Sequence, residues 1–186
     1  MLAKYILREA DFQKLLDAPW NLRDKLLIRL YYVTGARTME IARLKKSDVN
    51  LESNSIMIID SKKKIPFIIP IDVKTTELLR GYMSTLDNDY LFPSRQPSKR
   101  PYLCKEAIDY IIKWYAAKID LPYWNKWSPR QFRRHIARYW VQQHGDLTVL
   151  QQLLRHTNFA TTAGYVDAIR FDTELRSEYD KVMNRE

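Results

Sequence analysis

Apolar residues recur at helical spacing through most of the 186-residue chain. Leu22, Leu26, Leu27 and Leu30, for example, stand at positions i, i+4, i+5 and i+8, which places them on one face of a helix. The same spacing predicts helices over Glu9–Leu16, Leu22–Val33, Thr38–Lys45, Val73–Leu86, Leu103–Lys118, Pro129–Gln143 and Leu147–Leu154, with a last one within Phe171–Val182. The pattern therefore predicts a mainly helical protein.

Two short runs interrupt the helical pattern and predict a β-hairpin. Ser55–Asp60 and Ile65–Ile71 are rich in isoleucine, and a lysine-rich turn joins them. Pro66 and Pro70 have no amide hydrogen to donate, so the second run is expected at the edge of its sheet. Together with the helices, the hairpin predicts the α+β class: mainly helical, with a small antiparallel sheet packed beside a helical core.

The composition fits one globular domain, because 46% of the residues are apolar. No apolar run is long enough to span a membrane, and the N-terminus lacks the layout of a secretion signal. Cys104 is the only cysteine, which excludes an intramolecular disulfide and favours a reducing compartment. We expect a soluble intracellular protein in which Cys104 is buried.

Positive charge is concentrated in one region. The chain carries a net charge of +9, and residues 95–138 hold eleven Lys or Arg against three acidic residues. Aromatic residues alternate with these charges: Tyr102, Tyr110, Trp114, Tyr115, Tyr123, Trp124 and Trp127. This mixture favours a folded surface that faces phosphates, with an ordinary solvated face as the alternative.

Four arginines of the predicted helix Pro129–Gln143 share one stripe: Arg130, Arg133, Arg134 and Arg138. Their like charges repel one another, and an anion such as a phosphate lying against the stripe would offset that cost. The other face is expected to hold the helix to the core: Phe132, Ile136, Tyr139 and Trp140.

Two runs of the sequence resemble the signatures of the tyrosine recombinase (phage integrase) family. The first begins with the run Thr34–Leu44, which contains Arg37, and extends to Asp48. The second is more specific, with nine positions from His156 to Tyr165, and comprises Pro129, Phe132, Arg133, Leu153, Leu154, His156, Thr161, Thr162 and Tyr165. Arg37 alone would fit an ordinary surface arginine, and His156 alone would fit a capping or core histidine. Only the combination of these residues at these spacings is specific to the family.

The resemblance covers the chain from about Leu2 to Tyr165 and implies the family's catalytic-domain fold and activity. That activity is site-specific DNA recombination or integration through a 3′-phosphotyrosine intermediate, with chemistry like that of type IB topoisomerases, in a virus or mobile element. Arg37 and Arg133 would clamp the scissile phosphate, His156 would assist them, and Tyr165 would be the nucleophile.

The family also places a lysine on the hairpin, where it protonates the departing 5′ oxygen. Counting eight positions back from Pro70 gives Lys62, and Lys63 and Lys64 stay open as alternatives. The residues expected to bind DNA outside the catalytic set are Lys63, Lys64, Arg134 and Arg138.

Arg130 departs from the family, which usually has histidine three positions before the second arginine. Arginine keeps its proton, so Arg130 cannot accept one from Tyr165, although its charge can stabilise the phenolate. Basic replacements occur in archaeal virus integrases, and this favours an active enzyme of archaeal or archaeal-virus type. The alternatives are a lapsed, recombinase-like DNA-binding protein and a basic helical adaptor for RNA or protein.

Partners and domains follow from the same resemblance. Residues 1–166 are expected to form the catalytic domain, and residues 167–186 a tail helix that either packs on a neighbouring protomer or folds back. No metal-ligand spacing or Gly-rich phosphate loop is present, so no cofactor is expected.

We expect a cytoplasmic protein that is a monomer in free solution and a tetrameric synapse on double-stranded DNA. Because the family usually has a preceding core-binding domain, the chain reads as a fragment or an unusually small enzyme.

Overall fold

The computed structural model describes residues 7–60, 64–97, 99–143, 145–156, 158, 160 and 162–164. Its helices are α1 (Glu9–Asp17), α2 (Leu22–Thr34), α3 (Thr38–Ala42), α4 (Val73–Ser84), α5 (Lys105–Lys118), α6 (Pro129–Gln142) and α7 (Leu147–Leu154). Two 3₁₀ turns, η1 (Lys46–Asp48) and η2 (Trp124–Lys126), and three strands, β1 (Val49–Asn50), β2 (Ser55–Ile59) and β3 (Pro66–Pro70), complete the described elements. The predicted α+β class is confirmed.

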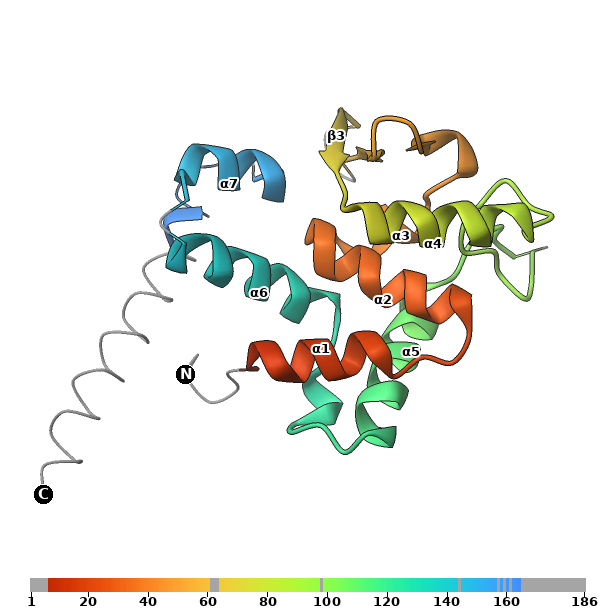
Figure 1. Ribbon diagram of the computed structural model, residues 1–186, viewed down its shortest axis with the longest axis horizontal. Coiled ribbons are helices and arrows are strands. Elements are labelled where there is room, and N and C mark those ends of the chain that lie inside the picture. The colour runs from red at the N-terminus through yellow and green to blue at the C-terminus, as the bar shows by residue number, and fades with distance from the viewer. Residues whose placement is uncertain are drawn as a thin grey trace, which may run out of the picture.

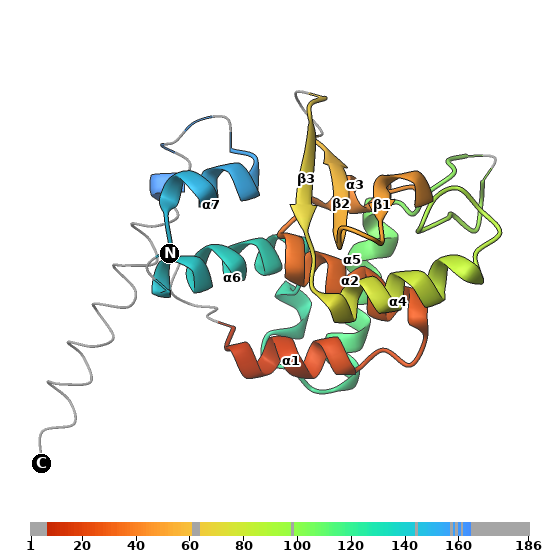
Figure 2. The same ribbon diagram turned by 45° about the horizontal axis from the view of Figure 1, so that its top comes forward.

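The helices enclose α2, which contacts α1, α4 and α6 (Figure 1). Its residues Leu26, Leu27, Leu30 and Tyr31 are fully buried in the main core. A second, small cluster of Ala137, Leu150 and Leu154 joins α7 to α6. Both views place α7 and the sheet on the same side of α2 and α6 (Figures 1 and 2), so α7 and β2 approach the C-terminal end of α2 from that side.

The sheet is antiparallel in the order β1-β2-β3, with Ile58 opposite Phe67. The strand that contains Pro66 and Pro70 lies at an edge, as predicted. The short β1 was not predicted, because two residues give no alternating pattern.

Three details of the sequence prediction were wrong. The helix that begins at Thr38 ends at Ala42, because the chain turns there so that Lys45 can pair with Tyr90 beside the sheet. Cys104 is half-buried and caps α5, where its Sγ accepts a hydrogen bond from the Ala107 amide at 3.4 Å. Tyr139 is 55% exposed rather than packed on the core.

The interleaved aromatic residues divide into two groups. Trp127 and Tyr115 are buried in the core, whereas Tyr110, Tyr123 and Trp124 are exposed. Only part of the predicted aromatic surface therefore faces solvent. In the part of the chain that the structure describes, every helix is too short or too polar to cross a lipid bilayer. The predicted tail helix lies outside the described residues.

Candidate active site

Arg37 stands between α2 and α3 and is held by groups from three parts of the chain. Its Nη1 donates to Glu40 Oε1 and to Asp60 Oδ2, both at 2.7 Å, and its Nη2 donates to the Arg155 carbonyl at 3.0 Å. These bonds use three of its five N–H groups. The side chain remains 28% exposed, so the guanidinium is fixed in orientation and still accessible to a ligand.

Two buried carboxylates set the charge around Arg37. The Glu40 side chain is fully buried and the Asp60 side chain is 4% exposed. Burial alone would lower the pKa of Arg37, but the bonds to both carboxylates raise it. Glu40 also accepts the backbone amide of Arg37 at 2.8 Å. The start of α3 is therefore closed by Glu40 and is not an open anion site.

Arg133 comes from α6 and is buried, with 6% of its surface exposed. Its Nη1 donates to the Gly35 carbonyl at 2.8 Å, and its Nη2 donates to the Leu154 carbonyl. One guanidinium thus connects the ends of α2 and α7 to α6. The two carbonyls fix the orientation of the Arg133 guanidinium, and its positive charge suits a phosphate ligand.

Gly35 permits this close approach. It ends α2 with a φ of 55°, a left-handed conformation that glycine adopts without strain. A Cβ here would also lie 3.1 Å from Ile136 Cδ1 and 3.3 Å from Leu154 Cδ2. The glycine before Arg37 is therefore required both by the turn and by the packing of α6 and α7.

The C-terminal turn of α7 presents Arg155 and His156. The backbone amide of Arg155 donates to the Gln152 carbonyl at 2.9 Å, and the backbone amide of His156 donates to the Gln151 carbonyl at 3.0 Å. This pair of bonds is the Schellman pattern that ends many helices. The His156 ring then meets Thr162, with Nδ1 2.9 Å from Oγ1. His156 is consequently held at both its backbone and its ring.

His156 is uncharged at neutral pH. Burial, and then the positive charges of Arg133, Arg37 and Arg155, lower the pKa of its imidazole to about 4. The neutral ring therefore adds no positive charge to the site and acts there as a hydrogen-bonding group. A bound phosphate would favour the protonated form, because its negative charge offsets the nearby arginines.

The four-arginine stripe of α6 is only partly as predicted. Arg133 is buried beneath α7, Arg130 is exposed in the first turn, and Arg134 and Arg138 are half-buried. His135 lies on another face, where its Nε2 is 2.8 Å from Glu9. His135 therefore does not replace the histidine that the family usually has at position 130.

The hairpin brings Asp60, the residue after β2, into this site. Asp60, which contacts Arg37, directly precedes the turn, and its carbonyl accepts the Lys64 amide at 3.0 Å. Lys64 is exposed and has a φ of 60°. Lys62, Lys63 and Tyr165 lie outside the described residues, so their roles stay predictions.

Sequence reasoning missed Glu40, Asp60 and Arg155. Glu40 carried a weak signal, because an acidic residue three positions after a helix cap often accepts the cap amide. Asp60 and Arg155 are 23 and 118 positions from Arg37, and nothing in the local pattern marks either one. Within the described ranges, no group of three or more His, Cys, Asp or Glu side chains is arranged to hold a metal ion.

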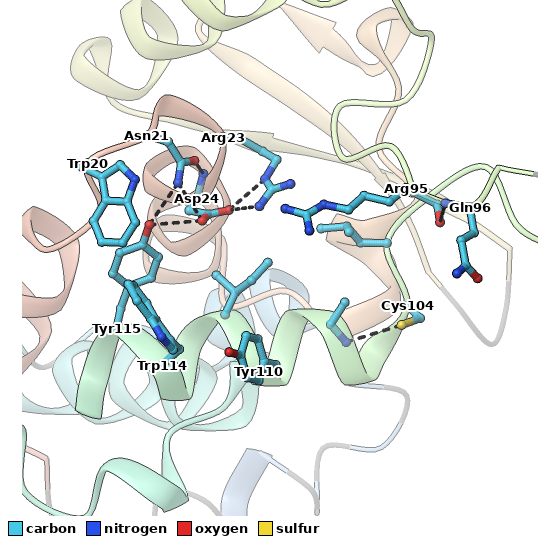
Figure 3. Close-up of a pocket in the computed structure, with 14 residues that line it drawn as sticks. Trp20, Asn21, Arg23, Asp24, Arg95, Gln96, Cys104, Tyr110, Trp114 and Tyr115 are labelled. Carbon is cyan, nitrogen blue, oxygen red and sulfur yellow. Dashed lines mark hydrogen bonds and ion pairs between the residues drawn. The ribbon is translucent and has the colours of Figure 1, made fainter. Parts of the chain in front are cut away.

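A pocket of 590 Å³ lies at the opposite end of α2 (Figure 3). Trp20, Asp24, Tyr110, Trp114 and Tyr115 are among the residues that line it. Arg37, Arg133 and His156 do not belong to this lining, so the pocket is separate from the arginine site.

Comparisons with known proteins point to one family. Residues 6–170 match the Phage integrase family. The chain is 30% identical over 161 residues to the tyrosine recombinase XerA of Pyrococcus horikoshii, covering 86% of this chain and 55% of that relative. It is also 30% identical over 186 residues to the tyrosine recombinase XerD of Haemophilus ducreyi, covering 92% of this chain and 60% of the relative.

Solved structures show the same fold. The crystal structure of XerA recombinase superposes with a TM-score of 0.77 at 26% identity, covering 98% of this chain and 66% of that one. The post-cleavage complex of XerH site-specific recombinase with palindromic difH substrate gives a TM-score of 0.76 at 22% identity. The match covers 96% of this chain and 53% of the XerH chain. The chain thus spans a little over half the length of the curated relatives named above, and the archaeal XerA agrees with the predicted archaeal type. From the matched residues, this chain belongs to the phage integrase family.

Proposed function

We propose that this chain is the catalytic domain of a site-specific recombinase or integrase that cuts and rejoins double-stranded DNA through a 3′-phosphotyrosine. The observation that carries the proposal is the convergence of Arg37, Arg133 and His156 from the ends of α2 and α7 and from α6. Two fixed guanidiniums and an imidazole suit a phosphodiester, whose charge increases during attack. The structural likeness to XerH bound to its difH substrate supports DNA as the ligand.

The reaction follows from these roles. Tyr165 gives up its hydroxyl proton to solvent water and its oxygen attacks phosphorus, the bond from phosphorus to the 5′ oxygen breaks, and the DNA 3′ end remains attached to the tyrosine. Lys62 donates a proton to the departing 5′ oxygen. Arg37 and Arg133 neutralise the charge that develops on the non-bridging oxygens. Because one phosphate ester replaces another, a 5′-hydroxyl from a second strand can reverse the step.

The remaining basic residues extend this proposal. Arg130 is exposed at the start of α6, where its charge would bind the phosphate and stabilise the Tyr165 phenolate. Lys63, Lys64, Arg134 and Arg138 would contact neighbouring backbone phosphates, which supplies affinity without reading sequence.

Recombination joins two duplexes and therefore cuts four strands, each of which needs its own tyrosine. We accordingly propose a tetramer on DNA, with residues 167–186 exchanged between protomers, and a monomer in free solution. Because the proposed substrate is DNA, we also propose a cytoplasmic location, at the nucleoid or in a host cell.

The test is covalent capture on DNA. Labelled duplexes with randomised arms, nicked close to the cleaved phosphate so that the short product diffuses away, are incubated with the protein in a chelator and run on a denaturing gel. We expect a protein–DNA adduct with the unaltered chain and none with Tyr165→Phe, which removes only the hydroxyl. Binding of the duplex without any adduct would instead indicate a lapsed, recombinase-like DNA-binding protein.

A further inference from the structure

Arg155 occupies a backbone conformation that its residue type disfavours. It is the residue after α7, with φ 54° and ψ 43°, where glycine is the usual residue. A non-glycine residue persists in the left-handed region when the surrounding structure determines its position. The contacts of the Arg155 side chain therefore need an explanation.

Those contacts are buried and charged. The Arg155 side chain is fully buried, its Nη2 lies 3.0 Å from Glu40 Oε2, and its Nη1 donates to the Leu153 carbonyl at 2.7 Å. Its Nε has no hydrogen-bond partner among the described residues. Burying a guanidinium with one donor unpaired is unfavourable, so Arg155 adds a desolvation cost to its backbone strain.

The charges around Arg37 provide a reason for Arg155 to be buried despite its backbone strain and desolvation cost. Glu40 and Asp60 both lie 2.7 Å from Arg37 Nη1, so these three side chains alone carry a net charge of −1. In a buried site of low dielectric, carboxylate charge this close to Arg37 weakens the attraction of Arg37 for a phosphate. The charge of Arg155 on the other oxygen of Glu40 brings the sum over these four side chains to zero.

We propose that Arg155 is a positioning residue for phosphate binding, which neutralises Glu40 so that Glu40 can orient Arg37 without cancelling its attraction for the scissile phosphate. This role rests on the proposed DNA cleavage. Arg155 acts through Glu40 and Arg37, and it need not touch the DNA.

Arg155→Gly tests this role with a residue that suits the backbone of the turn. Glycine suits the left-handed turn and keeps the carbonyl that accepts Arg37 Nη2. In single-turnover capture on the nicked duplexes, we expect adduct formation to slow about tenfold or more, because one compensating charge is lost from a buried site. Asn54→Gly, which relieves another left-handed residue (φ 47°) in the turn before β2, is the control and should cleave at the unaltered rate.

A double variant separates charge compensation from simple support of the turn. Adding Glu40→Gln to Arg155→Gly removes the uncompensated carboxylate, so we expect the double variant to cleave faster than Arg155→Gly alone. Residues in one buried network show such non-additive effects. A rate equal to the unaltered chain in Arg155→Gly, or losses that simply add in the double variant, would overturn the proposal.

Two further variants apply if Arg155→Gly fails to fold. Arg155→Lys keeps the charge and is expected to cleave within a few-fold of the unaltered chain, whereas Arg155→Gln loses it and should be slow. Equal rates for these two would overturn the role. If the unaltered chain forms no Tyr165 adduct, DNA cleavage itself is wrong; if the adduct forms and the Arg155 variants match it, only the role of Arg155 fails.

Discussion

A buried carboxylate lies near each end of α2, and the two are satisfied in different ways. Asp24, in the first turn, accepts from Asn21 Nδ2 at 2.8 Å and from the Tyr115 hydroxyl at 3.1 Å, and it pairs with Arg23 (Figure 3). Glu40, beyond the last turn, lies between the guanidiniums of Arg37 and Arg155.

The difference separates structural from functional use of a buried acid. Asp24 is bound mainly by neutral donors and an adjacent arginine, and burial followed by the charge of Asp24 raises the pKa of Tyr115 to about 12. The group is complete without a ligand and fixes α5 against the start of α2. Around Glu40, arginines are drawn into one small volume at an electrostatic cost, which a bound phosphate offsets.

Among these substitutions, Glu40→Gln is expected to have the largest effect on the free energy of unfolding. The substitution keeps the shape of Glu40 but leaves the fully buried Arg155 without its counter-charge, so we expect a loss of about 3–5 kcal/mol in the free energy of unfolding. Urea unfolding followed by circular dichroism measures it. A loss below about 1 kcal/mol would mean that Glu40 is not a buried ion-pair partner.

Arg133→Ala should have the next largest effect. Two buried carbonyls, those of Gly35 and Leu154, lose their donor, and we expect about 2–3 kcal/mol of destabilisation together with loss of the DNA adduct. Arg134→Ala, one position along α6 and half-buried, is the matched control for stability and should change it by no more than about 0.5 kcal/mol. Equal destabilisation by both would contradict the buried role of Arg133.

Asp24→Asn tests the buried carboxylate at the start of α2. The amide cannot accept as many hydrogen bonds as the carboxylate, so we expect about 1–2 kcal/mol of destabilisation. The rate of adduct formation should stay unchanged under conditions where the variant is folded. A large fall in that rate would show that the two ends of α2 are coupled.

The last prediction concerns pH and His156. The pKa of the folded-state imidazole is about 4 against an ordinary 6.5, so below pH 6.5 the unfolded chain binds a proton that the folded chain does not. This contribution to stability is therefore complete above pH 6.5 and is lost as the pH falls towards 4. Denaturation of His156→Gln between these pH values should show a flatter dependence than that of the unaltered chain; identical slopes would contradict the assignment.

The sequence predicted most of the fold and part of the site. Helical spacing located α2, α6 and α7 within a residue or two, and the prolines correctly placed β3 at an edge. The same spacing put Arg133 on an open stripe, because periodicity shows which residues share a face but not which element covers it. The fixing of Arg37 by Asp60 and Arg155 depends on contacts between distant segments, which no local pattern contains.

The way α7 is attached has a consequence for motion. The buried cluster that attaches it, Ala137, Leu150 and Leu154, is small, and Leu153 adds a partly buried contact with the main core, so we expect α7 to open locally at a lower free-energy cost than α2. Such an opening would remove Arg155 and His156 while Arg37 stays with Asp60 on the core side. Amide protons of α7 should therefore exchange with solvent faster than those of α2, and a bound phosphate should slow that exchange.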